Sequence, residues 1–315
     1  MPSAKTKNGV VAVLGYGSQG KAIAANLRDS GYQVVIGLKS RSRSRTRARR
    51  DGFRRVYTAR EATKLAKYIC VALPDHLHGR IYKQDIERNL NPGATLIFLH
   101  GFSVHFGFVV PPERCDVIMI APHAPGIAVR EKYLSDRSLS AFWAVHQDYT
   151  GRSTRTAQAL AAAMGFRRNR LVKTTFADEA VGDLFGEQAV LCGGLSELIL
   201  NGFEVLVERG LPAENAYLEV AYQLDLIISL IKQYGIEGMF ERISVTARYG
   251  SALAGKRIID RSVKKRMERL YEDIQTGKFA RKLNRLNPQD IQALRRLIKE
   301  RTSGPFEKAA KKYSK

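Results

Sequence analysis

The sequence has few of the features that mark secreted, membrane-spanning or zinc-stapled proteins. It has only three cysteines, Cys70, Cys115 and Cys192, which lie far apart among mostly apolar neighbours. That spacing fits neither a disulfide framework nor a zinc site, so we expect buried, reduced thiols. No apolar run reaches the roughly 18 residues that a bilayer-spanning helix needs, so we expect no membrane association.

The first residues also lack the features of a targeting signal. Met1 to Lys7 contain neither the hydrophobic region of a secretory signal nor an Arg/Ser-rich amphipathic presequence, which predicts a cytoplasmic protein. The chain has no linker rich in Pro, Gly and Ser, and its 315 residues are enough for two domains with cores of their own. We place these domains at residues 1–177 and 178–315.

Acidic residues are scarce relative to basic ones. The chain has 30 Asp and Glu against 52 Lys and Arg, a formal net charge of +22, and the excess is concentrated in residues 39–55 and 256–315. Such stretches can bind nucleic acid by releasing counterions, or can solvate a protein in a salty or hot cytoplasm. No helix-turn-helix, RNP or zinc-finger pattern accompanies the charge, so we do not expect a nucleic-acid partner.

A glycine-rich turn stands near the N-terminus between an apolar strand and a helix. Val10 to Leu14 is the expected strand, Gly15-Tyr-Gly-Ser-Gln-Gly20 is the turn, and the helix continues through Leu27. Glycines at this spacing allow a tight turn and the close approach of a pyrophosphate, whose charge then lies at the helix N-terminus. An ordinary β-α turn is the simpler alternative, but the position in the chain favours dinucleotide binding.

The next expected strand, Gln33 to Leu38, lacks the acidic residue that holds the ribose hydroxyl groups of NAD. In its place stands Lys39-Ser-Arg-Ser-Arg-Ser-Arg-Thr-Arg47, whose cations and hydroxyls suit a 2′-phosphate. We therefore infer NADP(H) rather than NAD(H). The tract could instead be a low-complexity RNA-binding or phosphorylated segment, but it lies between a strand and a helix inside the fold.

Further strands alternate with helices, which predicts an α/β fold with a doubly wound, parallel, Rossmann-type sheet. Ligands of such sheets lie at the carboxyl ends of the strands, where we expect Asp75, His100 and His123. Additional strands are expected over 68–73, 95–100, 117–121, 141–146 and 171–176, and helices over 59–66, 77–88 and 156–166. From about residue 178 the pattern is helical throughout, with helices over 214–232, 239–249, 261–275 and 288–301.

Two polar pairs interrupt the apolar helices of the second half. Asp183 and Glu187 are four residues apart, and Glu219 and Gln223 repeat that spacing. Each pair would project from one face of a largely buried helix, where a carboxylate needs a cation such as Mg²⁺. Two facing helices could then hold metal ions as in helical bundles, although an isolated Asp-x-x-x-Glu is more often one salt-bridged acid and one surface acid.

These motifs occur with Leu99-His-Gly-Phe-Ser-Val-His-Phe-Gly, Ala121-Pro-His-Ala-Pro-Gly and Asp183-Leu-Phe-Gly-Glu-Gln-Ala-Val-Leu-Cys-Gly-Gly. In this order they resemble ketol-acid reductoisomerase, in its short, class I form. The resemblance implies a Mg²⁺-dependent alkyl migration in a 2-acetohydroxy acid, followed by reduction with NADPH to a 2,3-dihydroxy acid for branched-chain amino-acid synthesis. It also implies a knotted helical domain and at least a homodimer.

The resemblance implies roles for individual residues. Metal ligands would be Asp183, Glu187, Glu219 and Gln223; catalytic residues would be His100, His123 and Glu219; and Ser244 would bind substrate. The NADPH contacts would be Gly15, Tyr16, Gly17, Ser18, Gln19, Gly20, Lys39, Ser42, Ser44, Asp75, His78 and Gly126.

The chain departs from the family pattern close to the expected reaction centre. Gln223 replaces a glutamate and His123 a lysine, while Ala124, Val245 and Arg248 replace a glycine, an asparagine and a glutamate. An amide brings no charge to a metal ion, so one ion should bind more weakly. The sequence is thus compatible with a working reductoisomerase. It is also compatible with a paralogue that binds NADPH and reduces another 2-keto acid without migration, or with a non-catalytic basic scaffold.

Overall fold

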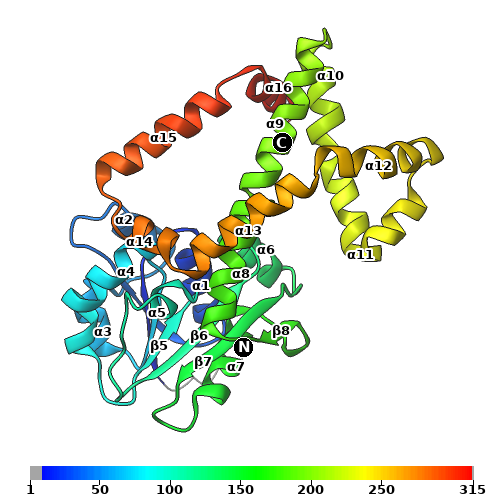
Figure 1. The fold of residues 1–315 in the computed structure, drawn as a ribbon. Helices are drawn as coiled ribbons and strands as arrows, with labels where there is room; N and C mark the ends of the chain where they lie inside the picture. The colour runs from blue at the N-terminus through cyan, green and yellow to red at the C-terminus, as the bar shows by residue number, and fades with distance from the viewer. Residues whose placement is uncertain (1–8, 314–315) are drawn as a thin grey trace. The chain divides into compact units, whose positions relative to one another are not determined.

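The computed structural model describes residues 9–313 and divides into two compact units, Met1–Gly182 and Asp183–Lys315 (Figure 1). The division falls inside helix α8, Phe176–Phe185. The boundary expected between residues 177 and 178 falls at the start of the same helix and stays a prediction.

The first unit is built on one eight-stranded sheet in the order β3-β2-β1-β4-β5-β6-β7-β8. Its strands are β1 Val10–Leu14, β2 Gln33–Gly37, β3 Val56–Tyr57, β4 Tyr68–Val71, β5 Thr95–Phe98, β6 Asp116–Pro122, β7 Ala141–Gln147 and β8 Leu171–Lys173. All neighbours pair in parallel except β6 and β7, so the predicted doubly wound, mainly parallel sheet is confirmed.

Helices cover both faces of this sheet, which explains why its strands are apolar on both sides. They are α1 Ser18–Asp29, α2 Ser44–Arg50, α3 Ala59–Leu65, α4 Asp75–Ile81, α5 Phe102–His105, α6 Gly126–Leu134 and α7 Ser153–Met164, with short turns η1 Tyr82–Ile86, η2 Glu87–Asn89 and η3 Arg168–Arg170. Side chains of β1 alternate between two cores: Val11 and Val13 belong to one, and Ala12 and Leu14 to the other.

Several local features of the first unit differ from expectation. β7 runs antiparallel to β6. The chain leaves the sheet after β6, forms α6, and re-enters the sheet at the same end, where Pro122 pairs with Ala141. The two-residue β3 and the short α2 were not predicted. α2 lies in the basic stretch 39–55, where charge hides the apolar periodicity on which such predictions depend, and β3 follows that stretch directly.

The second unit is all helical, as predicted. After α8 it contains the π-helical turn η4 Gly186–Leu191, then α9 Gly193–Glu208, α10 Ala213–Tyr217, the π-helical turn η5 Leu218–Tyr222, α11 Leu224–Arg242, α12 Val245–Ile258, α13 Arg261–Gln275, α14 Lys278–Asn284, α15 Pro288–Thr302 and α16 Pro305–Tyr313. An aromatic cluster joins α10 to α16, with Tyr217 5.4 Å from Phe306 and 5.9 Å from Tyr313 between ring centroids.

One predicted helix of this unit is divided. The expected helix 239–249 is broken at Ile243, whose extended backbone ends α11, and Ser244 begins α12 as its N-cap. The Ser244 hydroxyl accepts a hydrogen bond from the Ala247 amide at 3.1 Å. Serine is favoured at this position because it satisfies an amide that the first helical turn leaves free.

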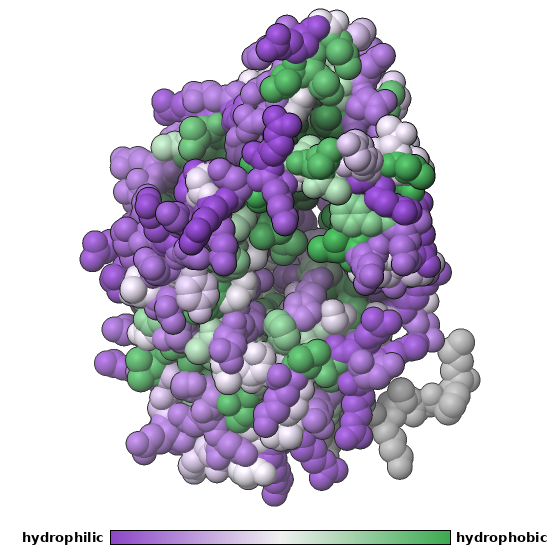
Figure 2. All heavy atoms as spheres, turned by 45° about the vertical axis from the view of Figure 1, so that its right-hand side comes forward, coloured by the Kyte–Doolittle hydropathy of each residue, from purple (hydrophilic) through white to green (hydrophobic). Residues whose placement is uncertain are grey.

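The prediction of largely buried helices in the second half is wrong for a single chain. In α9 only Leu200 and Phe203 are buried, whereas apolar side chains such as Leu198 and Val205 are exposed. The stretch Phe176–Glu208 is long and apolar enough, by length and composition alone, to cross a membrane, and few of its residues are fully buried. Figure 2 shows apolar residues on the molecular surface among the hydrophilic ones.

The cysteines follow the prediction only in part. Cys70 and Cys115 are buried free thiols, and burial raises the pKa of Cys70 to about 12. Cys192 is free but exposed, because it precedes α9 in the apolar stretch that the chain leaves uncovered. The expectation of buried thiols is therefore wrong for Cys192.

Candidate cofactor and metal site

A cavity of about 780 Å³ opens at the carboxyl ends of β1, β2 and β4. Of the predicted NADPH contacts, Gly15, Tyr16, Gly17, Ser18, Gln19, Gly20, Lys39 and Ser42 line it, and Ser44, Asp75, His78 and Gly126 do not. Ser40, from the tract expected to bind a 2′-phosphate, also lines it, whereas sequence reasoning missed other lining residues, including Leu73 and Asp85. The position agrees with the rule that parallel sheets bind ligands beyond their carboxyl ends.

The three glycines of the turn serve different purposes. Gly15 has a φ of +105°, and a Cβ there would lie 2.2 Å from the Ala72 carbonyl oxygen. A Cβ on Gly20 would lie 2.6 Å from the Gly15 oxygen. Gly17 has an ordinary φ of −78° and a Cβ would meet nothing within 4 Å, so no described neighbour forbids a side chain there. The open space above Gly17 fits a pyrophosphate at the start of α1.

Gln19 offers a further indication of a ligand. Its Nε2 donates to the Ala124 carbonyl at 2.7 Å, which fixes the orientation of the amide. Its buried Oε1 has no hydrogen-bond partner among the described residues. Buried acceptors are normally satisfied, so this atom suits a donor of a bound cofactor.

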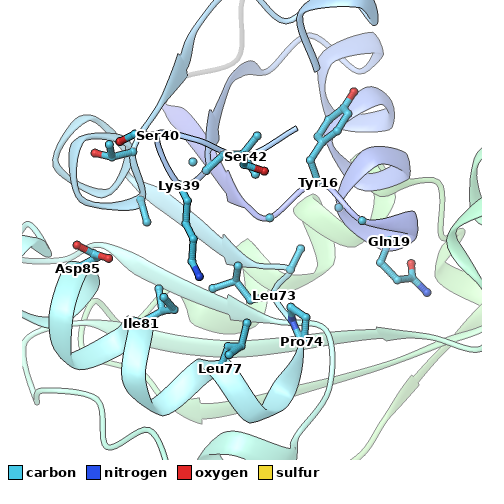
Figure 3. A pocket seen from close by; sticks show the side chains of 18 of the residues that line it. Tyr16, Gln19, Lys39, Ser40, Ser42, Leu73, Pro74, Leu77, Ile81 and Asp85 are labelled. Carbon is cyan, nitrogen blue, oxygen red and sulfur yellow. The ribbon is translucent and has the colours of Figure 1, made fainter. Parts of the chain in front are cut away.

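The basic loop after β2 forms one wall of the cavity. Lys39, Ser40 and Ser42 line it, and Figure 3 shows the Lys39 side chain reaching into the cavity toward Ile81. Ser44 instead begins α2, and its hydroxyl accepts a hydrogen bond from Arg47 Nη2 at 2.8 Å. The cation and hydroxyls of this wall fit a 2′-phosphate.

His78 lies behind the cavity wall. Its ring is 3% exposed, its Nε2–H donates to the Leu73 carbonyl at 2.8 Å, and its Nδ1 accepts from the Ser103 hydroxyl at 2.6 Å. Burial lowers the pKa of His78, more than the nearby Asp75 raises it. The neutral ring thus supports Leu73, which does line the cavity.

Gly126 also supports the turn from behind. It is the first residue of α6, and a Cβ there would lie 2.1 Å from the Ser18 carbonyl oxygen. Only glycine lets α6 approach the cofactor turn this closely.

Tyr16 is held by a hydrogen bond of its own, in which its hydroxyl donates to Asp51 at 2.9 Å. Burial and this hydrogen bond raise the pKa of Tyr16, so its hydroxyl stays protonated.

His100, two residues after β5, forms a pair with Glu179 that sequence reasoning missed. Glu179 is 4% exposed, and its Oε2 lies 3.0 Å from His100 Nδ1 and accepts the Gly101 amide at 2.6 Å. The signal was present in the sequence, because Glu179 precedes Asp183 by the same four residues that separate Asp183 from Glu187. All three therefore point to a similar side of one helical stretch.

His123 makes contacts with a different part of the first unit. It follows β6, its Nδ1 lies 2.9 Å from the Ser140 hydroxyl, and its ring packs edge-on against Phe142 at 4.3 Å between centroids. These contacts fix the ring plane at the carboxyl end of β6.

Two of the four predicted metal ligands, Glu187 and Glu219, lie in π-helical segments. Glu187 lies in η4, one turn after Asp183, and Glu219 lies in η5, which Gln223 follows directly. π-Helical turns are rare and occur often at functional sites. All four side chains are exposed and present oxygen atoms, the donors that Mg²⁺ prefers.

A single chain does not gather these ligands as expected. Among the described residues, Asp183, Glu187 and Glu219 do not form a group whose ligand atoms lie within 4.8 Å of one another. Gln223 Nε2 instead donates to Glu219 Oε2 at 3.3 Å. Along the chain, α9 separates η4 from η5. That two helices face each other across the metal ions stays a prediction.

Two family models match the chain, one in each half. The acetohydroxy acid isomeroreductase NADPH-binding domain matches residues 5–169, and the ketol-acid reductoisomerase C-terminal domain matches residues 176–315. The ketol-acid reductoisomerase (NADP(+)) of Pyrobaculum aerophilum is 45% identical over 98% of this chain and 94% of its own. The ketol-acid reductoisomerase (NADP(+)) of Pyrococcus abyssi is 47% identical over 87% of this chain and 82% of its own.

A solved structure resembles the chain over nearly its whole length. It is an NADH-preferring ketol-acid reductoisomerase from an uncultured archaeon, with a TM-score of 0.92, 38% identity, and coverage of 98% of this chain and 94% of that one. A semialdehyde dehydrogenase NAD-binding protein from Cupriavidus necator, at 19% identity and a TM-score of 0.66 over 86% and 98% of the two chains, shares the fold alone. The chain belongs to the ketol-acid reductoisomerase family.

Proposed function

We propose that this chain is a working ketol-acid reductoisomerase. It converts a 2-acetohydroxy acid to a 2,3-dihydroxy acid, with NADPH and Mg²⁺, in branched-chain amino-acid synthesis. The observation that carries the proposal is the cavity at Gly15 to Gly20, walled by Lys39 and Ser42, beyond which β5 ends in the His100–Glu179 pair.

The reaction balances as an isomerisation followed by a reduction. In 2-acetolactate the methyl group moves from C2 to C3, the C2 hydroxyl loses its proton and becomes a ketone, and the C3 ketone becomes a hydroxyl. A hydride then adds to C2 and a proton to its oxygen. When bound, Mg²⁺ supplies Lewis-acid polarisation of the substrate oxygens and NADPH supplies the hydride.

The chain's own groups position substrate and protons. The Glu179 carboxylate accepts from His100 Nδ1, which makes Nε2 the basic nitrogen of the ring and the one that would exchange a proton with substrate. The Ser244 hydroxyl accepts from the Ala247 amide and keeps its own proton to donate to a substrate carboxylate. Asp183, Glu187 and Glu219 would hold the Mg²⁺ ions, with Gln223 a weaker, uncharged ligand.

NADPH rather than NADH is supported by the wall of the cavity. The structural relative of highest TM-score named above prefers NADH, so family membership alone does not decide the cofactor. In this chain Lys39, Ser40 and Ser42 line the cavity where a 2′-phosphate would lie. Both curated relatives named above carry the NADP(+) designation.

We also propose a homodimer in which the second copy supplies Glu219 to the site of the first. Two observations support it. The described residues show no group of three metal-ligating side chains that joins Asp183 or Glu187 to Glu219, and Leu198, Val205 and Leu226 are exposed on α9 and α11. A second copy, rather than lipid, would cover this apolar surface, which is consistent with a cytoplasmic enzyme.

Complementation tests the shared site. Co-expressed Asp183→Asn and Glu219→Gln chains, each inactive alone, would form a mixed dimer that carries one intact site. Activity in the purified mixture is the expected result. A mixture as inactive as its parents, with light scattering reporting a dimer, would show that both ligands come from one chain.

The activity itself is tested with 2-acetolactate, Mg²⁺ and NADPH, by following the loss of NADPH absorbance. We expect cofactor oxidation with this substrate and also with 3-hydroxy-3-methyl-2-oxobutanoate, which needs reduction alone. Oxidation with the second compound only would indicate a reductase that has lost migration. A protein whose melting temperature does not rise with NADPH would indicate a non-catalytic scaffold.

A further inference from the structure

One arginine of the Arg/Ser tract differs from its neighbours. Arg45 is partly buried, and its guanidinium donates to three backbone carbonyls: Nη2 to Val56 at 2.8 Å, and Nη1 to Tyr57 at 3.0 Å and Leu38 at 3.2 Å. These carbonyls lie at the carboxyl ends of β2 and β3 or one residue beyond. Arg41 and Arg43, in contrast, are exposed.

The segment between Leu38 and Arg45 is a tight turn. The Ser42 amide donates to the Lys39 carbonyl at 3.0 Å, and the Arg45 amide donates to the Ser42 carbonyl at 3.1 Å. The Ser44 amide donates to the Ser42 hydroxyl at 3.2 Å. Because the Arg45 side chain returns to Leu38, it joins the two ends of the turn and closes it into a loop.

We propose that Arg45 is a positioning residue that holds this loop in its phosphate-binding form before the cofactor arrives. The inference rests on the proposed use of NADPH at the same site. A loop that had to be ordered on binding would lose conformational entropy at the expense of affinity. Arg45 removes that loss by fixing Lys39 and Ser42 at the cavity wall, and so raises the preference for a 2′-phosphorylated dinucleotide.

The geometry separates this role from direct contact with a phosphate. Arg45 does not line the cavity, and both of its terminal nitrogens are engaged by carbonyl oxygens. A planar guanidinium carries donors on separate nitrogens and can reach three acceptors on two strand ends at once. A lysine ammonium is a single compact charge and cannot reproduce these three hydrogen bonds. Charge alone should therefore not replace it.

Titrations with NADPH and NADH test the proposal in the full-length protein. Wild type is compared with Arg45→Lys, Arg45→Met and, as matched control, Arg49→Met, an exposed arginine of the same short helix. We expect both Arg45 variants to bind NADPH about ten-fold more weakly, NADH affinity to change by less than about two-fold, and the control to match wild type. Wild-type NADPH affinity in Arg45→Lys would overturn the proposal, because a point charge would then suffice.

Hydrogen exchange of the nucleotide-free protein distinguishes positioning from contact. In both Arg45 variants the amides of residues 40–44 should exchange faster than in wild type and in Arg49→Met. Weaker NADPH binding with unchanged exchange would indicate that Arg45 contacts the cofactor phosphate directly, and would overturn the proposal. If Arg45→Met does not fold, Arg45→Lys provides both readings. A wild-type protein without affinity for NADPH would instead contradict the proposed function.

Discussion

His100 Nδ1 lies 3.0 Å from the Glu179 carboxylate, which at the same time accepts the Gly101 amide at 2.6 Å. A carboxylate that has lost its proton can only accept hydrogen bonds, so the His100 Nδ1 carries the ring proton and Nε2 is the acceptor nitrogen of the ring. A Cβ on Gly101 would lie 2.9 Å from Glu179 Oε2, so glycine is needed for the carboxylate to reach the histidine. The acid that orients the histidine therefore belongs to the helix that also carries Asp183.

Glu179→Gln tests this orientation. The new amide would donate to His100 Nδ1 and would shift the ring proton to Nε2. We expect kcat to fall by about 10- to 100-fold, as for other groups that orient a reactive histidine, with no change in NADPH affinity. Steady-state kinetics measures both quantities, with the exposed Glu208→Gln as control. A kcat equal to that of wild type would show that Glu179 is only structural.

Gly17→Ala separates cofactor binding from folding. A Cβ at Gly17 meets no described atom within 4 Å, so the melting temperature should stay close to that of wild type. NADPH binding should weaken by at least about ten-fold, or roughly 1.4 kcal/mol, because the methyl group would occupy the space of the pyrophosphate. Gly255→Ala, in α12 and equally open, is the control. Unchanged NADPH affinity in Gly17→Ala would place the cofactor elsewhere.

Gln223→Glu should strengthen metal binding. The amide of Gln223 now donates to Glu219, whereas a carboxylate would add a negative charge and a second oxygen ligand. We expect Mg²⁺ to bind about ten-fold more tightly in calorimetric titration. Gln275→Glu, an exposed position of α13, controls for added charge alone. Equal Mg²⁺ affinity in Gln223→Glu and wild type would remove position 223 from the metal site.

His78 should make the first unit less stable in mild acid. Burial keeps its folded pKa below the value near 6.5 of an unfolded histidine, so on acidification the unfolded chain takes up a proton that the folded chain refuses. Stability is thus complete above about pH 6.5 and decreases as the pH falls toward the folded pKa. His105 and His146 have pKa values lowered by burial and add to the effect.

His78→Gln should flatten this dependence. A glutamine can donate to Leu73 and accept from Ser103 without titrating. The melting temperature of wild type, measured between about pH 7.5 and 5.5, should fall more than that of the variant. Parallel curves for the two proteins would show that His78 does not contribute.

The features that follow from local pattern were predictable from the sequence. The strand from Val10 to Leu14 is apolar on both faces, and the glycines that follow it need no distant partner to indicate a turn. The same holds for the loop at Lys39, since a missing acid and added cations are visible in the sequence itself. Those residues line the cavity.

The remaining features depend on contacts that no local pattern encodes. Glu179 reads as one more acid at the start of a helix until His100, far away in sequence, is brought to it. Arg45 looks like its neighbours in an alternating tract, and only the ends of β2 and β3 distinguish it. The four-residue spacing of Glu219 and Gln223 indicates that they share a helix face, but it does not indicate what that face contacts.

The proposed function is tested most directly by proton NMR of the product formed from 2-acetolactate and Mg²⁺ with NADPH deuterated at the transferred position. We predict 2,3-dihydroxy-3-methylbutanoate, with two methyl groups on C3 and deuterium on C2. Recovery of unchanged 2-acetolactate, or of 2,3-dihydroxy-2-methylbutanoate formed by reduction without migration, would contradict it.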